Sequence, residues 1–551
     1  MVGLARRLKA FILAMAPRQS LPDSRCFARD GIRSWIRGDL PSYRVPQRYE
    51  SDAAVRKQMA EKLQNVFDKG YITWGDVKSL TSYFSAPKGE GDICMVYDGT
   101  KCGLNDVLWV PSFCFARRGH IISNCGRNLL DGGYRHRGNV LKLPLDVFLQ
   151  PYCGVDLKPY LVTILSWVMW VRCAMGLKPS PYIAIRFMLL ASEVIRGDHR
   201  DPANALRYDT IRLNLPGQSN YNPSLPWVSK IIQATNKLSA DFVGYVDDLR
   251  PVGSSESECN QCARQISSVL GYLGIQDASR KQVGASKHAG VWAGSVVFAD
   301  EKGVGVNCTQ EKWEKTKAYL SVINAEMKVN DVLHHKTLER QRGFLIYVTR
   351  TYPIMVLYLK GIHLTLDSWR TGRDSEGWRM TMSELHHHFG ESDIVDNAPS
   401  GAPEYVYPAT RLEADITTLL IMTSDSTPPK RFVRSKVILS ACYGFGDASG
   451  SGFGSAVQGP GGLWYRHGIW GTDVNKDSSN YRELRNLVET IEEGVASGSL
   501  DGAELFLFTD NTVAEAAFYK GNTGSSKALF DLIIRLRLLE INGSVRLSES
   551  G

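Results

Sequence analysis

The chain contains 551 residues, of which 43% are hydrophobic and 22% are charged. This composition is typical of a globular protein, and the length allows two to four domains. The 65 basic and 57 acidic residues leave a formal charge of +8, which is compatible with a nucleic-acid partner but too small over this length to indicate one by itself.

The eleven cysteines form no paired framework, and no secretory signal is recognised ahead of them. Both observations predict free thiols in a reducing, intracellular compartment, nuclear or cytoplasmic. The longest apolar run, Leu161 to Val171, is too short to cross a bilayer, so no membrane partner is expected.

The first 300 residues predict a helical region followed by a mixed body. In residues 1–79, apolar side chains recur with a period of four between Ala53 and Phe67, which indicates an amphipathic helix. In residues 80–300, short apolar strands alternate with helical runs. The fold class expected is therefore α/β (α+β).

An acidic hairpin is predicted within this body at Tyr245-Val246-Asp247-Asp248. An apolar, β-favouring run precedes the two aspartates and another follows them, so the carboxylates should lie at a hairpin tip. Paired carboxylates at such a tip can bind catalytic magnesium ions, although an Asp-Asp pair in a turn is more often only solvated. After the hairpin, Ser255 and Glu258 predict a capping box ahead of an apolar helix.

The next two regions differ in composition. Residues 301–373 follow a mostly helical pattern, which suggests a helical appendage. Residues 374–435 are rich in acids, Ser, Pro and Thr and are expected to form a linker.

Residues 436–551 carry a second set of acids. Asp447 follows a strand-like run, Glu483 lies near the start of a helix that Ser479 can cap, and Asp510 follows the strand Glu504 to Phe508. Carboxylates from a strand, a helix and a second strand end can converge on one face. Such a cluster suits Mg²⁺, which prefers oxygen ligands and can activate water on a phosphodiester.

This order of acids resembles ribonuclease H, whose catalytic carboxylates come from the first strand, the first helix and the fourth strand. The spacings of 36 residues (447 to 483) and 27 residues (483 to 510) fit that layout. The family adds a final carboxylate, which is missing here because the chain stops at Gly551 in an expected fifth strand, Ser544 to Leu547. A C-terminally truncated domain is therefore expected.

A Tyr-x-Asp-Asp hairpin ahead of a ribonuclease H-like domain resembles the reverse transcriptases of retroelements. The segments Leu213 to Gly217 and Tyr352 to Trp369 are similar to retrotransposon polymerases of algae, oomycetes and fungi. The resemblance implies fingers and palm in residues 80–300 and a thumb or connection in residues 301–373. It implies substrate contacts for Tyr245, for Gly176 in a Gly-Leu-x-x-x-Pro turn and for Lys88. Lys281 matches a basic residue that assists the leaving pyrophosphate, with a plain surface lysine as the alternative.

The same resemblance implies the cofactors and partners. Asp247 and Asp248 would bind Mg²⁺, or Mn²⁺, for DNA synthesis from an RNA template, a DNA primer and deoxynucleoside triphosphates. Asp447, Glu483 and Asp510 would bind the same metal to cut RNA in RNA–DNA hybrids. Two alternatives stay open, namely a non-catalytic nucleic-acid-binding relic and a ribonuclease H-only activity.

One essential palm residue is not found. The family places a third aspartate in an Asp-x-Gly-Glu-Met-Phe-like stretch, and counting back from Gln150 reaches Arg135 or His136 instead. One choice of synonymous codons for residues 135–144, read one base later, gives Asp-Ile-Gly-Glu-Met-Phe-Leu-Asn-Phe. Residues 115–123 also recover family-like text in that frame. We therefore expect residues 115–143 to be translated out of frame and polymerase activity to be weak or lost.

Overall fold

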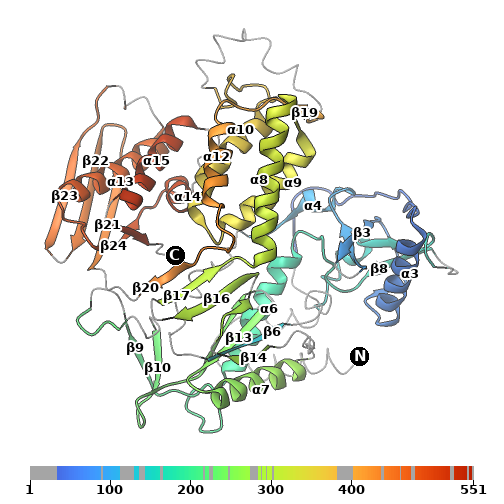
Figure 1. The fold of residues 1–551 in the computed structure, drawn as a ribbon. Coiled ribbons are helices and arrows are strands. Elements are labelled where there is room, and N and C mark those ends of the chain that lie inside the picture. Colours follow the sequence, from blue (N-terminus) through green and yellow to red (C-terminus); the bar gives the residue numbers. More distant parts are fainter. Residues whose placement is uncertain are drawn as a thin grey trace. The chain divides into compact units, whose positions relative to one another are not determined.

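The structure is a computed structural model of the whole chain (Figure 1). It describes residues 34–548 apart from gaps at 89–90, 112–129, 136–142, 162–165, 215–217, 223–227, 246–247, 274–282, 287, 293, 301–302, 381–400, 436–439, 460, 473, 475–477, 521–525 and 543–544. None of the helices formed by these residues is both long and apolar enough to traverse a membrane.

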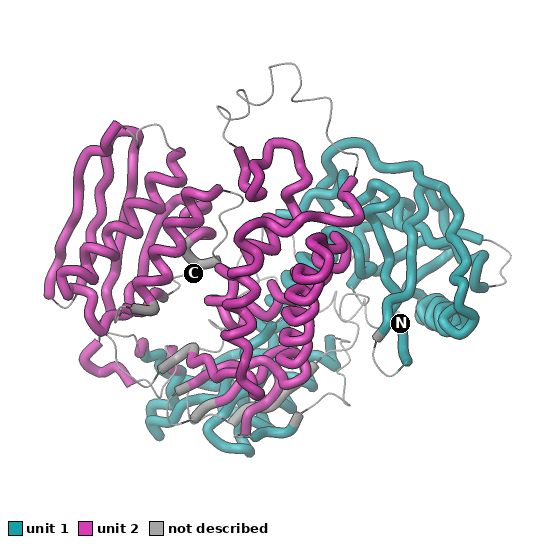
Figure 2. The backbone as a smooth tube through the Cα atoms, turned by 45° about the horizontal axis from the view of Figure 1, so that its top comes forward, with its two compact units in different colours: residues 1–121, 129–212, 230–287 teal, residues 122–128, 213–229, 288–551 magenta. Residues whose placement is uncertain are grey.

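The chain divides into two compact units, coloured separately in Figure 2. The first unit contains residues 1–121, 129–212 and 230–287, and the second contains residues 122–128, 213–229 and 288–551. The two expected acidic sites therefore belong to different units.

The N-terminal part of the first unit consists of small sheets and helices. The predicted helix is confirmed as α3, and the Asp52 side chain caps it by accepting hydrogen bonds from the Ala54 and Val55 amides. Apart from β6, which belongs to the next sheet, the elements before residue 200 are β1 (Trp35–Ile36), α3 (Ala53–Asp68), β2 (Ile72–Thr73), β3 (Ser82–Lys88), β4 (Asp92–Asp98), α4 (Leu104–Val107), β5 (Leu108–Trp109), the 3₁₀-helix η2 (Gln150–Tyr152), β7 (Gly154–Asp156), β8 (Trp167–Trp170) and α6 (Ser180–Arg196).

The first unit also contains a four-stranded antiparallel sheet in the order β12-β13-β6-β14. A separate three-stranded sheet, in the order β11-β10-β9, comes between α6 and β12 in sequence. The bounds are β6 (Leu130–Arg135), β9 (Thr210–Leu213), β10 (Val228–Ile232), β11 (Lys237–Leu238), β12 (Asp241–Tyr245), β13 (Asp248–Gly253) and β14 (Val283–Ser286). The expected hairpin is confirmed, since β12 and β13 pair along their length.

Helix α7 (Glu256–Tyr272) follows the hairpin and presents Cys262, Ile266 and Leu270 to the core of the first unit. Half of the predicted capping box is confirmed, because the Ser255 hydroxyl accepts from the Glu258 amide at 3.2 Å. The Glu258 carboxylate accepts from the Ser254 amide at 3.0 Å and not from Ser255.

The second unit begins with the antiparallel sheet β15-β16-β17-β20 and a group of helices. Its helices share an apolar core of their own, centred on residues such as Trp313, Leu345 and Ile416. The elements are β15 (Gly290–Trp292), β16 (Ser295–Asp300), β17 (Gly303–Asn307), α8 (Gln310–Asn330), β18 (Leu333–His334), α9 (His335–Thr349), the 3₁₀-helix η4 (Pro353–Leu359), α10 (Lys360–Asp367), β19 (Tyr405–Val406), α12 (Leu412–Met422) and β20 (Arg431–Ser435).

Part of the linker prediction is corrected. Helix α12 and strand β20 both lie within residues 374–435, and α12 buries Leu412, Ile416 and Leu419 in the helical core. These three residues repeat at helical spacing, so burial of one apolar face outweighs the polar composition around it.

The C-terminal residues form a five-stranded sheet in the order β23-β22-β21-β24-β25 (Figure 1). The β23-β22-β21 pairs are antiparallel, while β21-β24 and β24-β25 are parallel. The elements are β21 (Ser440–Ala448), β22 (Gly452–Gly459), β23 (Gly462–Ile469), α13 (Ser479–Ala496), β24 (Ala503–Phe508), α14 (Thr512–Lys520), α15 (Lys527–Asn542) and β25 (Arg546–Ser548). The mixed α/β fold class is confirmed.

Two local predictions for this domain need correction. Helix α13 is capped by Ser478, whose hydroxyl accepts from the Tyr481 amide, and not by Ser479, which is its first residue. The fifth strand begins at Arg546 instead of Ser544. Both shifts are of one or two residues, the usual uncertainty of element ends.

Candidate metal centre

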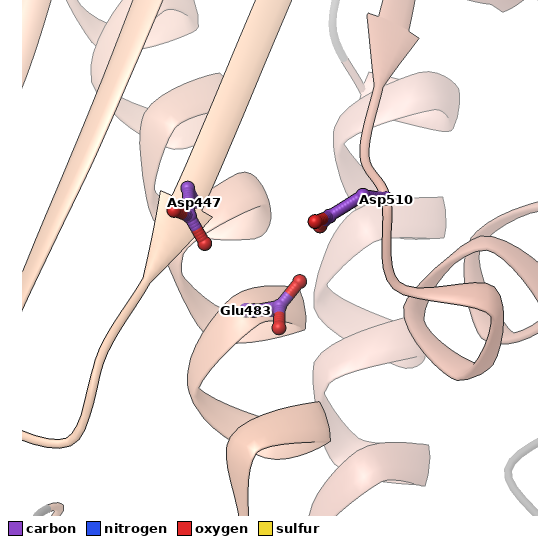
Figure 3. Close-up of side chains that lie close together, drawn as sticks. All are labelled: Asp447, Glu483 and Asp510. Atoms are coloured by element: carbon purple, nitrogen blue, oxygen red, sulfur yellow. The ribbon is translucent and has the colours of Figure 1, made fainter.

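Three carboxylates converge in the C-terminal domain. Asp447 lies one residue before the end of β21, Glu483 lies in the second turn of α13, and Asp510 lies between β24 and α14. Their ligand oxygens all lie within 4.8 Å of one another, and Figure 3 shows the three side chains turned toward a common centre. Asp447 and Asp510 are exposed, and Glu483 is the least exposed of the three.

Sheet topology brings the two aspartates together. Strands β21 and β24 are parallel neighbours in which Phe445 is paired with Phe508, and each aspartate comes two residues after its phenylalanine. Because parallel strands end at the same edge of a sheet, both carboxylates emerge there. The predicted convergence is found in the structure.

Asn486 fixes the helix that carries Glu483. This asparagine is fully buried, and its side-chain amide donates to the Asp447 carbonyl at 3.0 Å and to the Gly454 carbonyl at 2.8 Å. Its side-chain oxygen accepts from the Arg466 guanidinium at 3.0 Å. A buried amide with every partner satisfied holds α13 at one height over the sheet.

The residues on either side of Asp510 bind the Glu483 carboxylate. The Asn511 side-chain amide donates to Glu483 Oε1 at 3.0 Å, and the Thr509 hydroxyl donates to Oε2 at 3.4 Å. The carboxylate of Glu483 is thus oriented by the same loop that carries Asp510.

This donor set fits a hard divalent cation. All three ligand groups are carboxylates, which suit Mg²⁺ or Mn²⁺ and not metals that prefer sulfur or imidazole. Three like charges within 4.8 Å repel one another, and a bound cation removes this repulsion. Asp447, Glu483 and Asp510 would hold the metal.

The predicted palm site is described only in part. The backbones of Tyr245 and Asp248 are paired across the hairpin, while Val246 and Asp247 lie outside the described residues. On its other side, the backbone of Asp248 is paired with that of Arg135 in β6. The strand beside the acidic hairpin therefore brings an arginine, and not an aspartate, to this position.

Gly176 lies in a tight turn against the end of β4. Its φ of +101° belongs to the left-handed region, and a β-carbon there would lie 1.5 Å from the Tyr97 carbonyl oxygen, so only glycine fits. The Asn105 side chain donates to the Gly176 carbonyl and accepts from the Lys178 amide, each at 2.8 Å.

The structure gives little information on the two lysines that the sequence predicts to bind substrate. Lys88 is the last residue of β3, where its backbone is paired with that of Asp92. Lys281 lies outside the described residues. The substrate-binding roles of Lys88, Gly176, Tyr245 and Lys281 stay predictions.

Sequence reasoning missed three asparagines at these sites. Asn511 follows directly on Asp510, which could have drawn attention to it as a helix cap. Asn486 lies one turn after Glu483 on α13, a usable signal for a residue on the same helix face. Asn105 is 71 residues from its partner Gly176, and no local pattern points to that contact.

No protein-family model matches the chain, and no curated protein matches it. Solved structures do match. The foamy viral protease-reverse transcriptase dRH in complex with ds DNA has a TM-score of 0.44 and 11% identity, over 99% of this chain and 81% of that chain. The foamy viral protease-reverse transcriptase in complex with RNA/DNA hybrid has a TM-score of 0.48 and 10% identity, over 99% of this chain and 63% of that chain. The foamy viral protease-reverse transcriptase in complex with dsDNA has a TM-score of 0.44 and 12% identity, over 99% of this chain and 97% of that chain. These are likenesses of backbone arrangement.

Proposed function

We propose that this chain is a retrotransposon-derived reverse transcriptase–ribonuclease H whose C-terminal site cuts RNA in RNA–DNA hybrids and whose polymerase site is impaired. The convergence of Asp447, Glu483 and Asp510 within 4.8 Å carries the first half of this proposal. The pairing of Arg135 with Asp248 carries the second half.

The proposed reaction is hydrolysis of a phosphodiester in the RNA strand. Bound Mg²⁺ would activate the attacking water and stabilise the leaving oxygen. The chain's own contribution is orientation, since the Asn486 amide holds the strand end of Asp447, and Asn511 and Thr509 hold the carboxylate of Glu483. Such preorganisation avoids rearrangement of the ligands during the reaction.

Hybrid cleavage tests the first half of the proposal. We expect the full chain to shorten a labelled RNA strand annealed to DNA when Mg²⁺ or Mn²⁺ is present, and Asp510→Asn to abolish this activity. The matched control is Glu515→Gln, which neutralises an exposed acid in the first turn of α14 outside the cluster. Hybrid binding without any cleavage would instead favour a non-catalytic relic.

The proposed polymerase defect follows from a missing carboxylate. A palm needs a third carboxylate beside the acidic hairpin, because two metal ions align the primer hydroxyl and the triphosphate. The residue paired with Asp248 is Arg135, which offers no carboxylate. The partners of an intact site would be an RNA template, a DNA primer and deoxynucleoside triphosphates.

The out-of-frame hypothesis converges on the same position. The shifted reading of residues 135–144 begins with aspartate at position 135, which is the residue paired with Asp248. Sequencing the transcript over residues 115–143 tests it, because codons that cannot encode the shifted text would rule it out.

A further inference from the structure

The Asn511 side chain has two different sets of partners, one on each side of its amide group. Its oxygen accepts from the Val513 and Ala514 backbone amides, each at 2.9 Å, and so caps α14. Its nitrogen donates to Glu483 Oε1 at 3.0 Å and to Asn480 Oδ1 at 2.9 Å.

The cap determines which way the amide faces. Backbone N–H groups at a helix start require an acceptor, so the oxygen of Asn511 must point into α14. Both N–H bonds are then directed at α13, where Glu483 and Asn480 present oxygens. The orientation is therefore fixed by the chemistry of both ends of the side chain.

We propose that Asn511 is a positioning residue that sets the orientation of the Glu483 carboxylate toward a divalent cation. This inference rests on the proposed ribonuclease H-like site and adds a residue that acts through Glu483. The shorter of the two side-chain hydrogen bonds to this carboxylate is the one from Asn511 to Oε1, at 3.0 Å, and the bond from the Thr509 hydroxyl to Oε2 measures 3.4 Å. The carboxylate that they hold lies beside those of Asp447 and Asp510 (Figure 3). Groups that orient a metal ligand in this way typically change affinity by about 10- to 100-fold.

Asn511→Ser separates orientation from capping. Serine is as good a helix cap as asparagine, but its short hydroxyl has no second donor that reaches Glu483. The experiment is a titration of the full chain with Mn²⁺, in which electron paramagnetic resonance measures how much Mn²⁺ is bound. The relevant binding event is the one that Asp510→Asn removes. We expect Asn511→Ser to weaken that event about 10-fold or more.

A double variant distinguishes positioning from general weakening of the fold. In a Glu483→Ala background the ligand is gone, so Asn511→Ser should cause no additional loss of Mn²⁺ affinity. The matched control is Ser526→Ala, which removes the hydroxyl that accepts from the Leu529 amide at the start of α15. This control should leave Mn²⁺ affinity within about twofold of wild type, because Ser526 is not one of the three carboxylates and caps a different helix.

The outcomes separate the two proposals. If the wild-type chain shows no Mn²⁺ event that Asp510→Asn removes, the proposed metal site is wrong. If that event exists but Asn511→Ser matches wild type, or if the loss persists without Glu483, only the positioning role is overturned. Should Asn511→Ser lose its folded circular dichroism signal, Asn511→Thr, which also retains a capping hydroxyl, replaces it in the same titration.

Discussion

The two acidic sites of this molecule differ in how their carboxylates are brought together. In the C-terminal domain, three acids from β21, α13 and the β24–α14 loop meet within 4.8 Å, and asparagines hold two of them. In the first unit, the acidic hairpin has Arg135 on the neighbouring strand. A motif of two acids in the sequence is therefore not enough to specify a metal site, which depends on the whole set of ligands.

The largest expected effect on activity comes from removing one carboxylate of the C-terminal cluster. Asp447→Asn should lower the rate of hybrid cleavage by more than about 100-fold, because even groups that only orient metal ligands are worth about 10- to 100-fold. The measurement is RNA cleavage under single-turnover conditions, with Asp531→Asn on the exposed side of α15 as the control. Full activity in Asp447→Asn would mean that the cluster is not the catalytic centre.

The next effect comes from supplying a carboxylate beside the acidic hairpin of the first unit. Arg135→Asp should raise Mg²⁺-dependent primer extension by at least about tenfold, since it replaces an opposing charge by a metal ligand. Arg135→Ala is the control, because it removes the charge without supplying a ligand. Equal extension by the two variants would show that the defect is not a missing carboxylate.

Gly176→Ala tests whether the first unit requires the tight turn at this position. An alanine β-carbon would lie 1.5 Å from the Tyr97 carbonyl, so we expect a loss of more than about 3 kcal/mol in the free energy of unfolding. Gly271→Ala is the control, since its β-carbon meets nothing within 4 Å in a helix, and it should stabilise by about 1 kcal/mol. Chemical denaturation compares the two, and a neutral Gly176→Ala would contradict the turn geometry.

A smaller effect on stability than that of Gly176→Ala concerns the packing of α10 against the C-terminal domain. Burial, with help from the neighbouring Arg373, lowers the pKa of Lys360 from 10.5 to about 8, and its ammonium lies 4.9 Å from the Trp378 ring centre and 5.6 Å from that of Phe530. Lys360→Met should stabilise the chain by about 2 kcal/mol at neutral pH, because it removes a buried charge but also a cation–π contact.

That difference should shrink as the pH rises. The unfolded chain keeps the Lys360 proton up to pH 10.5 and the folded chain only to about 8, so wild type gains stability relative to Lys360→Met across this window. Urea unfolding at several pH values measures the change. Lys336→Met, at an exposed position of α9, should show no such trend, and a parallel pH dependence in both variants would contradict the assignment.

The sequence predicted most of what depends on order and periodicity. The spacing of Asp447, Glu483 and Asp510 predicted their convergence, and the apolar period of four predicted α3. Helix α12 was missed because Ser, Pro, Thr and acids dominate its surroundings, although Leu412, Ile416 and Leu419 carry the helical repeat. Composition averaged over a long segment conceals one short apolar face.

Other features could not be predicted because they depend on contacts between distant residues. Asn511 and Glu483 are 28 residues apart, and neither residue type at that spacing indicates a hydrogen bond. The pairing of Arg135 with Asp248 agrees with the position reached by counting along the sequence. The sequence alone, however, does not show which residue of β6 lies opposite Asp248, because that register is set by the pairing of β6 with β13.

The parallel pairing of β21 with β24 also means that the candidate metal centre exists only in the folded chain. Asp447 and Asp510 become neighbours only after the chain has crossed through α13 and the second strand has joined the first, so an unfolded chain offers no such site. A ligand that binds only the native state stabilises it by mass action, by about 2.7 kcal/mol at 100 times its dissociation constant. The melting temperature of this domain should therefore increase with Mg²⁺ or Mn²⁺ concentration even before any substrate is found.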